Sequence, residues 1–387
     1  MGVFEAPSDE LPTPASTPER ISRFVVEAAV NAPSVHNTQP WWFYGEEHEI
    51  GMHADRERRL PVADPDGREM LVSCGAALFT ARVALRSLGI VPHVRVLPDP
   101  DLPDLVARIT WSEVRQSADY ERELYAEIRR RRTHRGGFDT EPLPAGILTA
   151  VASEAAKEQA TLRILSDEAE RKALGAVVDA ADFALRQDRA RAREEASWAP
   201  PPGSKRRDGV PATAYPARPE RIEPHFAGRD FARGHGWGLP PGGQSRLPRS
   251  AGVVALLATG ADRPDDWIGA GRALQRVLLF LSACGLSAAL HSQPLEIVQL
   301  RDFIRLHFAG GAHPQMLLRF GATEQDAVSV RRRSTTRFSE RRDRAPGPRA
   351  PGRRSRTDMT ISRGCRPGLA GTIARESGSL PGARRTR

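Results

Sequence analysis

Three stretches of the chain carry apolar residues at helical spacing. The first is a short amphipathic run from Ile21 to Ala29, and the second extends from Cys74 to Gly89. In the third, which ends at Gly285, apolar side chains recur with the stripe by which a helix packs onto a core, at Leu274, Val277, Leu278 and Leu281. The glycine that closes each longer stretch suits a left-handed C-terminal cap. We therefore predict three packed helices.

The two longer helices share a local sequence pattern. Both begin with Gly-x-Ala-Leu, at Gly75 and at Gly271, and both end about ten residues later at a glycine. Two similar helices separated by about 196 positions suggest an internal duplication. A chance similarity is the alternative, because helices that are rich in Ala and Leu and end at glycine are common.

Five other runs have the character of β-strands. They span residues 93–97, 105–111, 161–165, 251–259 and 316–320. The fourth is almost entirely apolar, which is typical of a central strand buried on both faces. Because helix-like and strand-like runs follow one another without a regular β-α-β alternation, the sequence favours an α+β fold over a doubly wound sheet.

Composition limits the class of protein. With 387 residues, 40% of them apolar, the chain is long enough for two domains or one large one. It contains no apolar run long enough to span a membrane, and residues 1–20 are acidic and proline-rich rather than signal-like. The three cysteines are widely spaced and form neither a disulfide framework nor a zinc pattern. We therefore predict a cytoplasmic protein with a flexible N-terminus at residues 1–20, no membrane span and no metal site.

The net charge of +9 is concentrated near the C-terminus. Residues 329–387 contain 17 arginines and four acidic residues, which give +13 and leave −4 for the first 328 residues. From residue 322 onward the chain is rich in Arg, Pro and Gly without apolar periodicity, so we expect residues 322–387 to be disordered. A basic tail that binds nucleic acid or an acidic partner is one interpretation of this segment.

A change of reading frame near residues 322–334 is a second hypothesis for the tail. Arginine outnumbers lysine by 54 to 3, as in GC-rich genes, and such genes read out of frame yield this composition. A shifted reading of suitable codons for residues 334–339 gives Asp-Asp-Ala-Val-Leu, which suits a helix end. Sequencing the gene tests this idea, which fails if no shifted frame continues with helix-like sequence.

A loop with hydrogen-bonding side chains follows the first predicted helix. Residues 32–41 read Ala-Pro-Ser-Val-His-Asn-Thr-Gln-Pro-Trp. The prolines restrict the backbone, while Ser34, Asn37 and Gln39 can both donate and accept hydrogen bonds. Such a loop suits the polar edge of a flat heterocycle. Taken alone, the same string also fits an ordinary turn.

A basic run that contains a hydroxyl lies about 95 residues further on. Arg131, Thr133 and Arg135 alternate, so an extended segment would direct all three side chains to one side. Guanidinium groups and a hydroxyl donor match a phosphate ester. Taken alone, the run is better explained as a solvated basic patch at the end of a helix predicted at residues 121–130, where cations complement the helix dipole.

Residues 198–249 form a long stretch of Pro, Gly, Arg and isolated aromatic residues with little periodicity. A loop of this length inside a compact domain is usually either functional or disordered. We predict that this stretch is a lid.

Together the two motifs resemble those of the FMN-dependent nitroreductase superfamily. The order Pro-Ser-x-x-Asn-x-Gln-Pro-Trp, from Pro33, is similar to the loop that contacts the isoalloxazine ring in that family. The order Arg-x-Thr-x-Arg-x-x-Phe, from Arg131, is similar to the segment that grips the FMN phosphate. Further matches from about residue 20 to 321 resemble the Acg-like branch of the superfamily, at Asp64–Glu69, Asp208–Pro211, Gln293–Glu296 and His313–Gly321.

The order of the two motifs implies a fused chain. In ordinary family members the phosphate segment precedes the Pro-Ser loop, and one FMN takes contacts from both subunits. Here the second half of the chain would supply the phosphate grip and the first half the ring loop. The resemblance therefore implies an α+β nitroreductase-like fold with halves at residues 21–125 and 126–321, an intrachain pseudo-dimer, and the lid in the second half. We expect a monomer, with a homodimer of such chains as the alternative.

The resemblance also implies FMN as the cofactor and a set of residues that bind it. No side-chain acid or nucleophile is required for flavin chemistry, so no catalytic residue is assigned. Family members carry arginines beyond the last strand, which places one arginine of the run at residues 331–333 near the phosphate. The predicted cofactor-binding residues are Pro33, Ser34, Val35, His36, Asn37, Gln39, Arg131, Thr133, Arg135 and Arg332.

Two functions of different classes follow from this interpretation. In the first, the protein transfers hydride from NAD(P)H to FMN and on to a nitroaromatic or quinone acceptor. In the second, it binds and sequesters flavin with little turnover, because the lid covers a single site; the Acg-like branch resembles nitroreductases with an obstructed pocket.

A third and less favoured interpretation is a protein that binds nucleic acid through its basic tail. It predicts a salt-dependent affinity for DNA that is lost on truncation at Gly321.

Overall fold

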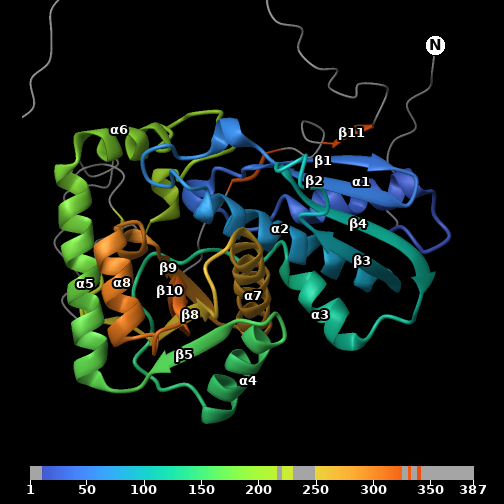
Figure 1. Ribbon diagram of the computed structural model, residues 1–387. Coiled ribbons are helices and arrows are strands. Elements are labelled where there is room, and N and C mark those ends of the chain that lie inside the picture. The colour runs from blue at the N-terminus through green and yellow to red at the C-terminus, as the bar shows by residue number, and fades with distance from the viewer. Residues whose placement is uncertain (1–10, 216–219, 230–248, 325–329, 333–337, 341–387) are drawn as a thin grey trace, which may run out of the picture. The chain divides into compact units, whose positions relative to one another are not determined.

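Antiparallel sheets and helices make up the computed structural model, which describes residues 11–215, 220–229, 249–324, 330–332 and 338–340 (Figure 1). The helices are α1 (Pro18–Ala29), α2 (Arg68–Ser87), α3 (Asp119–Glu127), α4 (Ala145–Ala156), α5 (Glu168–Gln187), α6 (Arg189–Ser197), α7 (Pro264–Ala283) and α8 (Val298–His307). The strands are β1 (Trp41–Glu46), β2 (Glu49–Ala54), β3 (Ile90–Val96), β4 (Leu105–Val114), β5 (Thr161–Leu165), β6 (Ile222–Glu223), β7 (Arg249–Ser250), β8 (Val253–Thr259), β9 (Ser287–His291), β10 (His313–Gly321) and β11 (Phe338–Glu340). Single 3-10 turns are η1 (Val35–Asn37), η2 (Arg56–Arg58), η3 (Ala212–Ala214) and η4 (Gln293–Leu295).

The strands form two main sheets. The first has the order β11-β1-β2-β4-β3 and the second the order β5-β8-β10-β9, while β6 and β7 form a short ribbon. Neighbouring strands in both main sheets are antiparallel, apart from the parallel pair of β1 and β11. The five predicted strands and the three predicted helices are present with ends that differ by a few residues, and the α+β class is confirmed.

The central strand of the second sheet is buried on both faces, as its apolar sequence predicts. Ala255 and Leu257 of β8 belong to the core that contains α7 and α4. Val254 and Leu256 belong to a second core that contains residues of α5 and α8. The second sheet is therefore covered by helices on both sides (Figure 1).

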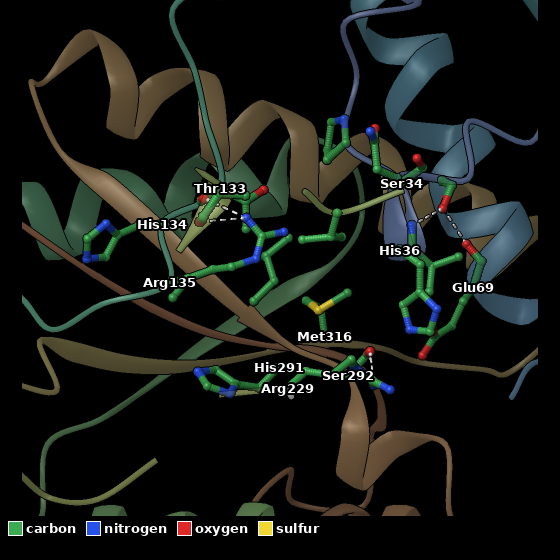
Figure 2. A pocket seen from close by; sticks show the side chains of 18 of the residues that line it. Ser34, His36, Glu69, Thr133, His134, Arg135, Arg229, His291, Ser292 and Met316 are labelled. Carbon is green, nitrogen blue, oxygen red and sulfur yellow. Dashed lines mark hydrogen bonds between the residues drawn. The ribbon is translucent and has the colours of Figure 1, made fainter. Parts of the chain in front are cut away.

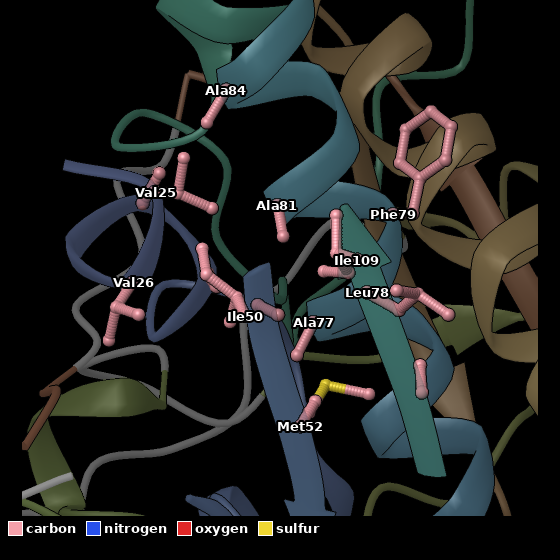
Figure 3. Packing of buried hydrophobic residues seen from close by; sticks show 14 of the residues in the cluster. Val25, Val26, Ile50, Met52, Ala77, Leu78, Phe79, Ala81, Ala84 and Ile109 are labelled. Carbon is pink, nitrogen blue, oxygen red and sulfur yellow. The ribbon is translucent and has the colours of Figure 1, made fainter. Parts of the chain in front are cut away.

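The first sheet packs against α1 and α2 (Figure 3). Val25 of α1 and Ala77 of α2 join Ile50 of β2 and Ile109 of β4 in one apolar cluster, and each of them is fully buried. On β1, Trp41 and Phe43 point into this core, whereas the intervening Trp42 is 37% exposed. The strand alternation therefore places one face of the sheet on the helices and the other toward solvent.

Helices α2 and α7 pack against each other through the glycines of their shared motif (Figure 1). A Cβ atom on Gly271 would lie 2.0 Å from the Val72 carbonyl oxygen, and one on Gly75 would lie 2.1 Å from that of Ile268. The backbones therefore touch at this crossing, which only glycine allows. Gly89 and Gly285 follow the two helices with φ values of +78° and +71°, so the predicted left-handed caps are also found.

Part of the C-terminal segment is structured, which corrects the expectation that all of residues 322–387 are disordered. Residues 330–332 lie against the loop after α1, and β11 pairs with β1 so that Phe338 is opposite Phe43. Local composition missed these contacts because both are made to distant parts of the chain. Most of the remaining tail, residues 325–329, 333–337 and 341–387, lies outside the described residues, as do residues 1–10.

In the described part of the chain, one helix is long and apolar enough to cross a membrane, namely α2. However, 78% of its apolar window is buried inside the folded structure. This burial is typical of a core helix, and α2 accordingly packs against α1, β2 and α7.

Candidate functional site

A cavity of about 150 Å³ lies where the loop after α1 meets the second sheet (Figure 2). Its walls come from segments that are far apart in the sequence. They are the loop 33–37, the first half of α2, residues 133–135, 209–211, 214–215 and 228–229, Leu274 of α7, residues 289–292 at the end of β9, residues 315, 316 and 319 of β10, and residues 330–331. Among the predicted cofactor-binding residues, the lining includes Pro33, Ser34, Val35, His36, Asn37, Thr133 and Arg135.

The loop after α1 adopts an unusual backbone conformation. His36, Asn37 and Gln39 have φ values of +44°, +53° and +50°, a region that residues other than glycine seldom occupy. The Ser34 hydroxyl accepts a hydrogen bond from the Gln39 N–H at 2.9 Å, and the Ser73 hydroxyl of α2 accepts one from the Val35 N–H at 3.1 Å. Such conformations persist where surrounding contacts stabilise them, and they are often found at functional sites.

Asn37 joins three segments of the chain. Its amide nitrogen donates to the carbonyl oxygens of Gly209, at 2.9 Å, and Val330, at 3.1 Å. Its amide oxygen accepts from Nη1 of Arg331 at 3.0 Å. Although Asn37 lines the cavity, these contacts engage the amide that the sequence analysis assigned to the ring. Its principal role in this structure is to hold residues 209 and 330–331 against the loop.

Gln39 lies behind the cavity wall rather than in it. Its amide nitrogen donates to the Arg207 carbonyl oxygen at 2.9 Å, and its amide oxygen accepts from the backbone N–H of Arg332, also at 2.9 Å. Gln39 therefore supports the wall. Arg332, the arginine predicted from the tail, is likewise absent from the lining, whereas its neighbour Arg331 is part of it.

Arginine side chains gather near one end of the cavity, where Arg135 and Arg331 belong to the lining, whereas Arg131 and Arg132 do not. Nη2 of Arg131 and Nη2 of Arg331 approach the same acceptor, the Asn31 carbonyl oxygen, at 3.5 Å and 3.3 Å. Arg131 is 3% exposed, and among the described residues its Nε and Nη1 atoms have no hydrogen-bond partner. Burial and the charges of Arg132 and Arg135 lower the pKa of Arg131 to about 10. Burial and the charges of three arginines also hold the pKa of Arg331 well below its usual range.

The electrostatics of this arginine cluster (Arg131, Arg132, Arg135 and Arg331) favour an anion. Each charge that shifts the pKa of Arg131 or Arg331 belongs to another arginine of the cluster. Like charges held together in a poorly solvated place raise the free energy of the protein unless a counter-ion joins them. The planar guanidinium groups suit the oxygen atoms of a phosphate or carboxylate.

The segment 131–138 reaches the cavity along the edge of the second sheet. Thr133 forms a bridge with Ala288, and the His134 N–H donates to the Ala288 carbonyl oxygen at 2.8 Å. Figure 2 shows Thr133 and Arg135 side by side on one wall, where Nη1 of Arg135 donates to the Thr133 carbonyl oxygen at 3.3 Å. The guanidinium of Arg135 also lies over the Tyr215 ring, 5.5 Å from its centre.

The other end of the cavity carries polar residues that the sequence analysis did not assign. Glu69, from the first turn of α2, is 4% exposed, and Nη2 of Arg68 donates to its Oε1 at 2.9 Å. Arg229 pairs with Glu296 and donates to the Ser292 hydroxyl at 3.1 Å. Glu69 and Glu296 fall within the segments that resemble the Acg-like branch. No sequence pattern distinguishes these buried acids from solvated ones, because their burial depends on the tertiary structure.

Two histidines in the cavity wall are electrically neutral. Burial, together with the charges of Arg229, Arg135 and Arg191, holds the pKa of His36 well below its usual value. Burial and the charge of Arg319 do the same for His291, whose Nε2 accepts from Nε of Arg319 at 2.9 Å. Among the described residues, no group of three His, Cys, Asp or Glu side chains is arranged to hold a metal ion.

The fold and the site define an α+β protein with a pocket that has Arg135 and Arg331 at one end and Glu69 and Arg229 at the other, lined by residues from 33–76 and from 133–331. No family model matches the chain. The Mycobacterium tuberculosis (strain H37Rv) protein named "Putative NAD(P)H nitroreductase Rv3131" is 37% identical over 305 residues, which cover 77% of this chain and 84% of that protein. "Putative NAD(P)H nitroreductase acg" of the same strain is 26% identical over 301 residues, covering 78% and 88%. The chain therefore belongs to the nitroreductase superfamily.

Similar solved structures carry the same family name. A "putative nitroreductase" from Anabaena variabilis covers 79% of this chain and 88% of its own, with 10% identity and a TM-score of 0.42. The FMN-dependent nitroreductase NfnB from Mycobacterium smegmatis, solved in complex with NADPH, covers 57% and 100%, with 19% identity and a TM-score of 0.32.

Proposed function

We propose that this protein is an FMN-dependent oxidoreductase that passes hydride equivalents from NAD(P)H to a nitroaromatic or quinone acceptor. The observation that carries the proposal is the arginine cluster, in which the buried guanidinium of Arg131 has two nitrogen atoms without a partner among the described residues. An unpartnered buried donor fits the phosphate of FMN, which offers several acceptor oxygens and a negative charge.

Each wall of the cavity has a role in this proposal. Arg131, Thr133, Arg135 and Arg331 would hold the phosphate, and Pro33–His36 would face the ring. The bound flavin would supply the redox chemistry, while the protein sets its orientation and the access of water. Neutral His36 and the apolar side chains of Val35, Leu274 and Met316 suit the plane of an aromatic ring.

The contribution of both halves of the chain supports a fused arrangement. Residues 33–37 belong to the half at residues 21–125, and residues 133–135 to the half at 126–321. Helix α2, which packs on the first sheet, contacts helix α7, which packs on the second sheet, at Gly75 and Gly271. We infer that the halves form an intrachain pseudo-dimer, so that a monomer can bind one FMN.

The experiment that tests the function is an absorbance spectrum of the purified protein with FMN, followed by anaerobic addition of NADPH. We expect bound FMN that bleaches on reduction. Arg131→Met should weaken FMN binding at least tenfold, since a charge-assisted hydrogen bond contributes about 1.5–3 kcal/mol. The matched control is Arg130→Ala, because Arg130 belongs to the same basic run but points into solvent with 74% of its side chain exposed. Equal losses in both variants, or no FMN binding by the wild type, would overturn the proposal.

Flavin sequestration is the second candidate, and a specific contact favours it. The predicted lid contributes residues 209–211, 214 and 215 to the cavity lining, and the Gly209 carbonyl oxygen accepts a hydrogen bond from the Asn37 amide. Bound FMN that stays oxidised with NADPH would support this function. In that case, deletion of residues 200–245 should restore NADPH oxidation, and no gain on deletion would count against an autoinhibiting lid. Residues 216–219 and 230–248 of this lid lie outside the described residues.

A further inference from the structure

Glu69 belongs to the cavity lining and has one buried carboxyl oxygen without a hydrogen-bond partner among the described residues. Its Oε1 accepts from Nη2 of Arg68, but among the described residues its Oε2 has no hydrogen-bond partner. The residue is 4% exposed and belongs to the cavity lining. Figure 2 shows it on the opposite side from Thr133 and Arg135, next to the loop that carries His36.

The surroundings of Glu69 favour a protonated carboxyl group. The ion pair with Arg68 lowers the pKa of Glu69, but this effect is smaller than those of burial and of the charge of Glu296. Glu296, by contrast, is bound by Arg191, Arg229 and the Ser292 hydroxyl, and its negative charge acts on Glu69. Burial, followed by the charge of Glu296, raises the pKa of Glu69 to about 8. The charged or titratable groups that face Glu69 from the elements around it are Arg68, Asp64, Glu296, Arg229 and His36.

We propose that Glu69 is a catalytic residue, the proton donor to a carbonyl oxygen of a quinone acceptor bound in this cavity. This inference rests on the proposed function. Reduction of a quinone to a hydroquinone takes one hydride, which NAD(P)H supplies through the flavin, and one proton. The O–H bond at Oε2 of Glu69 breaks, an O–H bond forms on the acceptor, and water returns a proton to the carboxylate. The two electrons come from NAD(P)H, so atoms and charges balance.

The geometry also selects the class of acceptor. A protonated carboxyl group donates a hydrogen bond to an uncharged oxygen, and the cations beside it, Arg68 and Arg229, are paired with Glu69 and Glu296. A general acid is most effective when its pKa lies near the working pH, which this group satisfies. We therefore expect neutral quinones to be better acceptors than quinones that carry a carboxylate substituent.

The test uses the FMN-loaded protein, reduced anaerobically with NADPH and mixed with duroquinone between pH 6 and pH 10. For the wild type we expect the rate of flavin reoxidation to fall about tenfold per pH unit above about pH 8, where the donor loses its proton. Glu69→Gln should lower the rate at pH 7 by roughly 10²–10⁴-fold and remove this pH dependence, because an amide has no transferable proton. The control is Glu127→Gln, since buried Glu127 accepts from the Ser282 hydroxyl at 2.6 Å outside the cavity.

A second measurement does not depend on turnover. Infrared difference spectra of the FMN-free protein between pH 6 and pH 10 should contain the C=O band of a protonated carboxyl group, and Glu69→Gln should remove it. Bound and reducible FMN with the same pH profile in wild type and Glu69→Gln would overturn the role of Glu69 alone. A wild type that binds no FMN would overturn the proposed function as well, and the absorbance spectrum distinguishes these two results.

Discussion

At the scale of single residues, the site holds ionisable groups in states that cost free energy. Arg131 is a buried cation among other cations, and Glu69 is a buried carboxyl group beside the charge of Glu296. Groups that destabilise a folded protein are retained where they serve binding or catalysis, and their perturbed pKa values cluster at functional sites. Both residues therefore give stability predictions that can be tested without knowledge of the substrate.

Glu69 should make stability depend on pH. The unfolded chain releases this proton near pH 4.5, whereas the folded protein keeps it up to about pH 8. Between these values the folded state binds more protons, so the contribution of Glu69 to stability falls as pH rises, by at most about 1.4 kcal/mol per pH unit. Urea unfolding of wild type and Glu69→Gln at pH 5 and pH 8 measures the effect. The variant should gain relative to wild type at the higher pH, and a difference independent of pH would contradict the prediction.

Arg131→Met should stabilise the protein when FMN is absent. The substitution removes a buried charge that has no carboxylate partner and keeps an unbranched side chain of similar length. We expect a gain of roughly 1–3 kcal/mol in the free energy of unfolding, measured by urea titration of the FMN-free protein. The same variant should show a smaller rise in Tm on addition of FMN than the wild type does. A destabilised FMN-free variant would show that Arg131 has a structural partner.

At the scale of elements, the crossing of α2 and α7 determines how the two sheets are joined. The glycines of the repeated motif lie at this crossing, so the similarity between the helices has a direct physical reason, whether or not it arose by duplication. Val72 of α2 and Leu274 of α7 also line the cavity. The spacing of the two helices therefore sets one wall of the site.

Gly271→Ala should destabilise the protein strongly. The added methyl group would meet the Val72 carbonyl oxygen at 2.0 Å, and a backbone atom of a core helix cannot move aside as a flexible side chain can. We expect a loss of about 3 kcal/mol or more in the free energy of unfolding, or failure to fold.

The matched control is Gly269→Ala in the same helix, where the new methyl group would meet nothing closer than 3.8 Å. It should be neutral or stabilising by about 0.5–1 kcal/mol, because glycine is a poor helix former. Similar stabilities of the two variants in thermal unfolding would exclude a tight crossing.

At the scale of the whole molecule, the cavity exists only because segments from both ends of the chain meet. Asn37, Gly209 and Val330 are joined by hydrogen bonds at one point, and β11 lies beside β1 of the first sheet. Residues 330–332 and β11 thus belong to the same compact unit as the site.

Two truncations test this role of the C-terminal segment. A chain that ends at residue 324 lacks Arg331 and β11, so it should bind FMN at least tenfold more weakly, as expected for the loss of one charged hydrogen bond. A chain that ends at residue 342 keeps the whole unit and should bind FMN as the full-length protein does. Titration followed by flavin fluorescence measures both affinities. Equal affinities of the two truncated chains would show that residues 330–340 do not contribute.

The periodicity of the sequence indicated α1, α2 and α7, the strands β3, β4, β5, β8 and β10, and the α+β class, because the packing of these elements is reflected in the local order of apolar residues. It did not indicate α4, α5, α6, α8, β1, β2 or β9. Two motifs marked the loop at 33–37 and the run at 131–135. Prolines restrict the backbone next to them, and alternating cations point to one side of an extended segment, so both signals are visible in the local sequence. The apolar run at 251–259 likewise indicated burial on both faces. All of these signals involve residues that are close together in the chain.

Only the tertiary structure decided which side chains meet. The choice of Arg331 rather than Arg332 depends on the path of a segment that contacts Asn37 from 294 positions away in the chain. The use of the Asn37 amide by Gly209 and Val330, and the isolation of Glu69 beside Glu296, depend on contacts of the same kind. The burial of a side chain and the charges around it depend on residues that are close in space. A single sequence reveals these residues only where they are also close together in the chain.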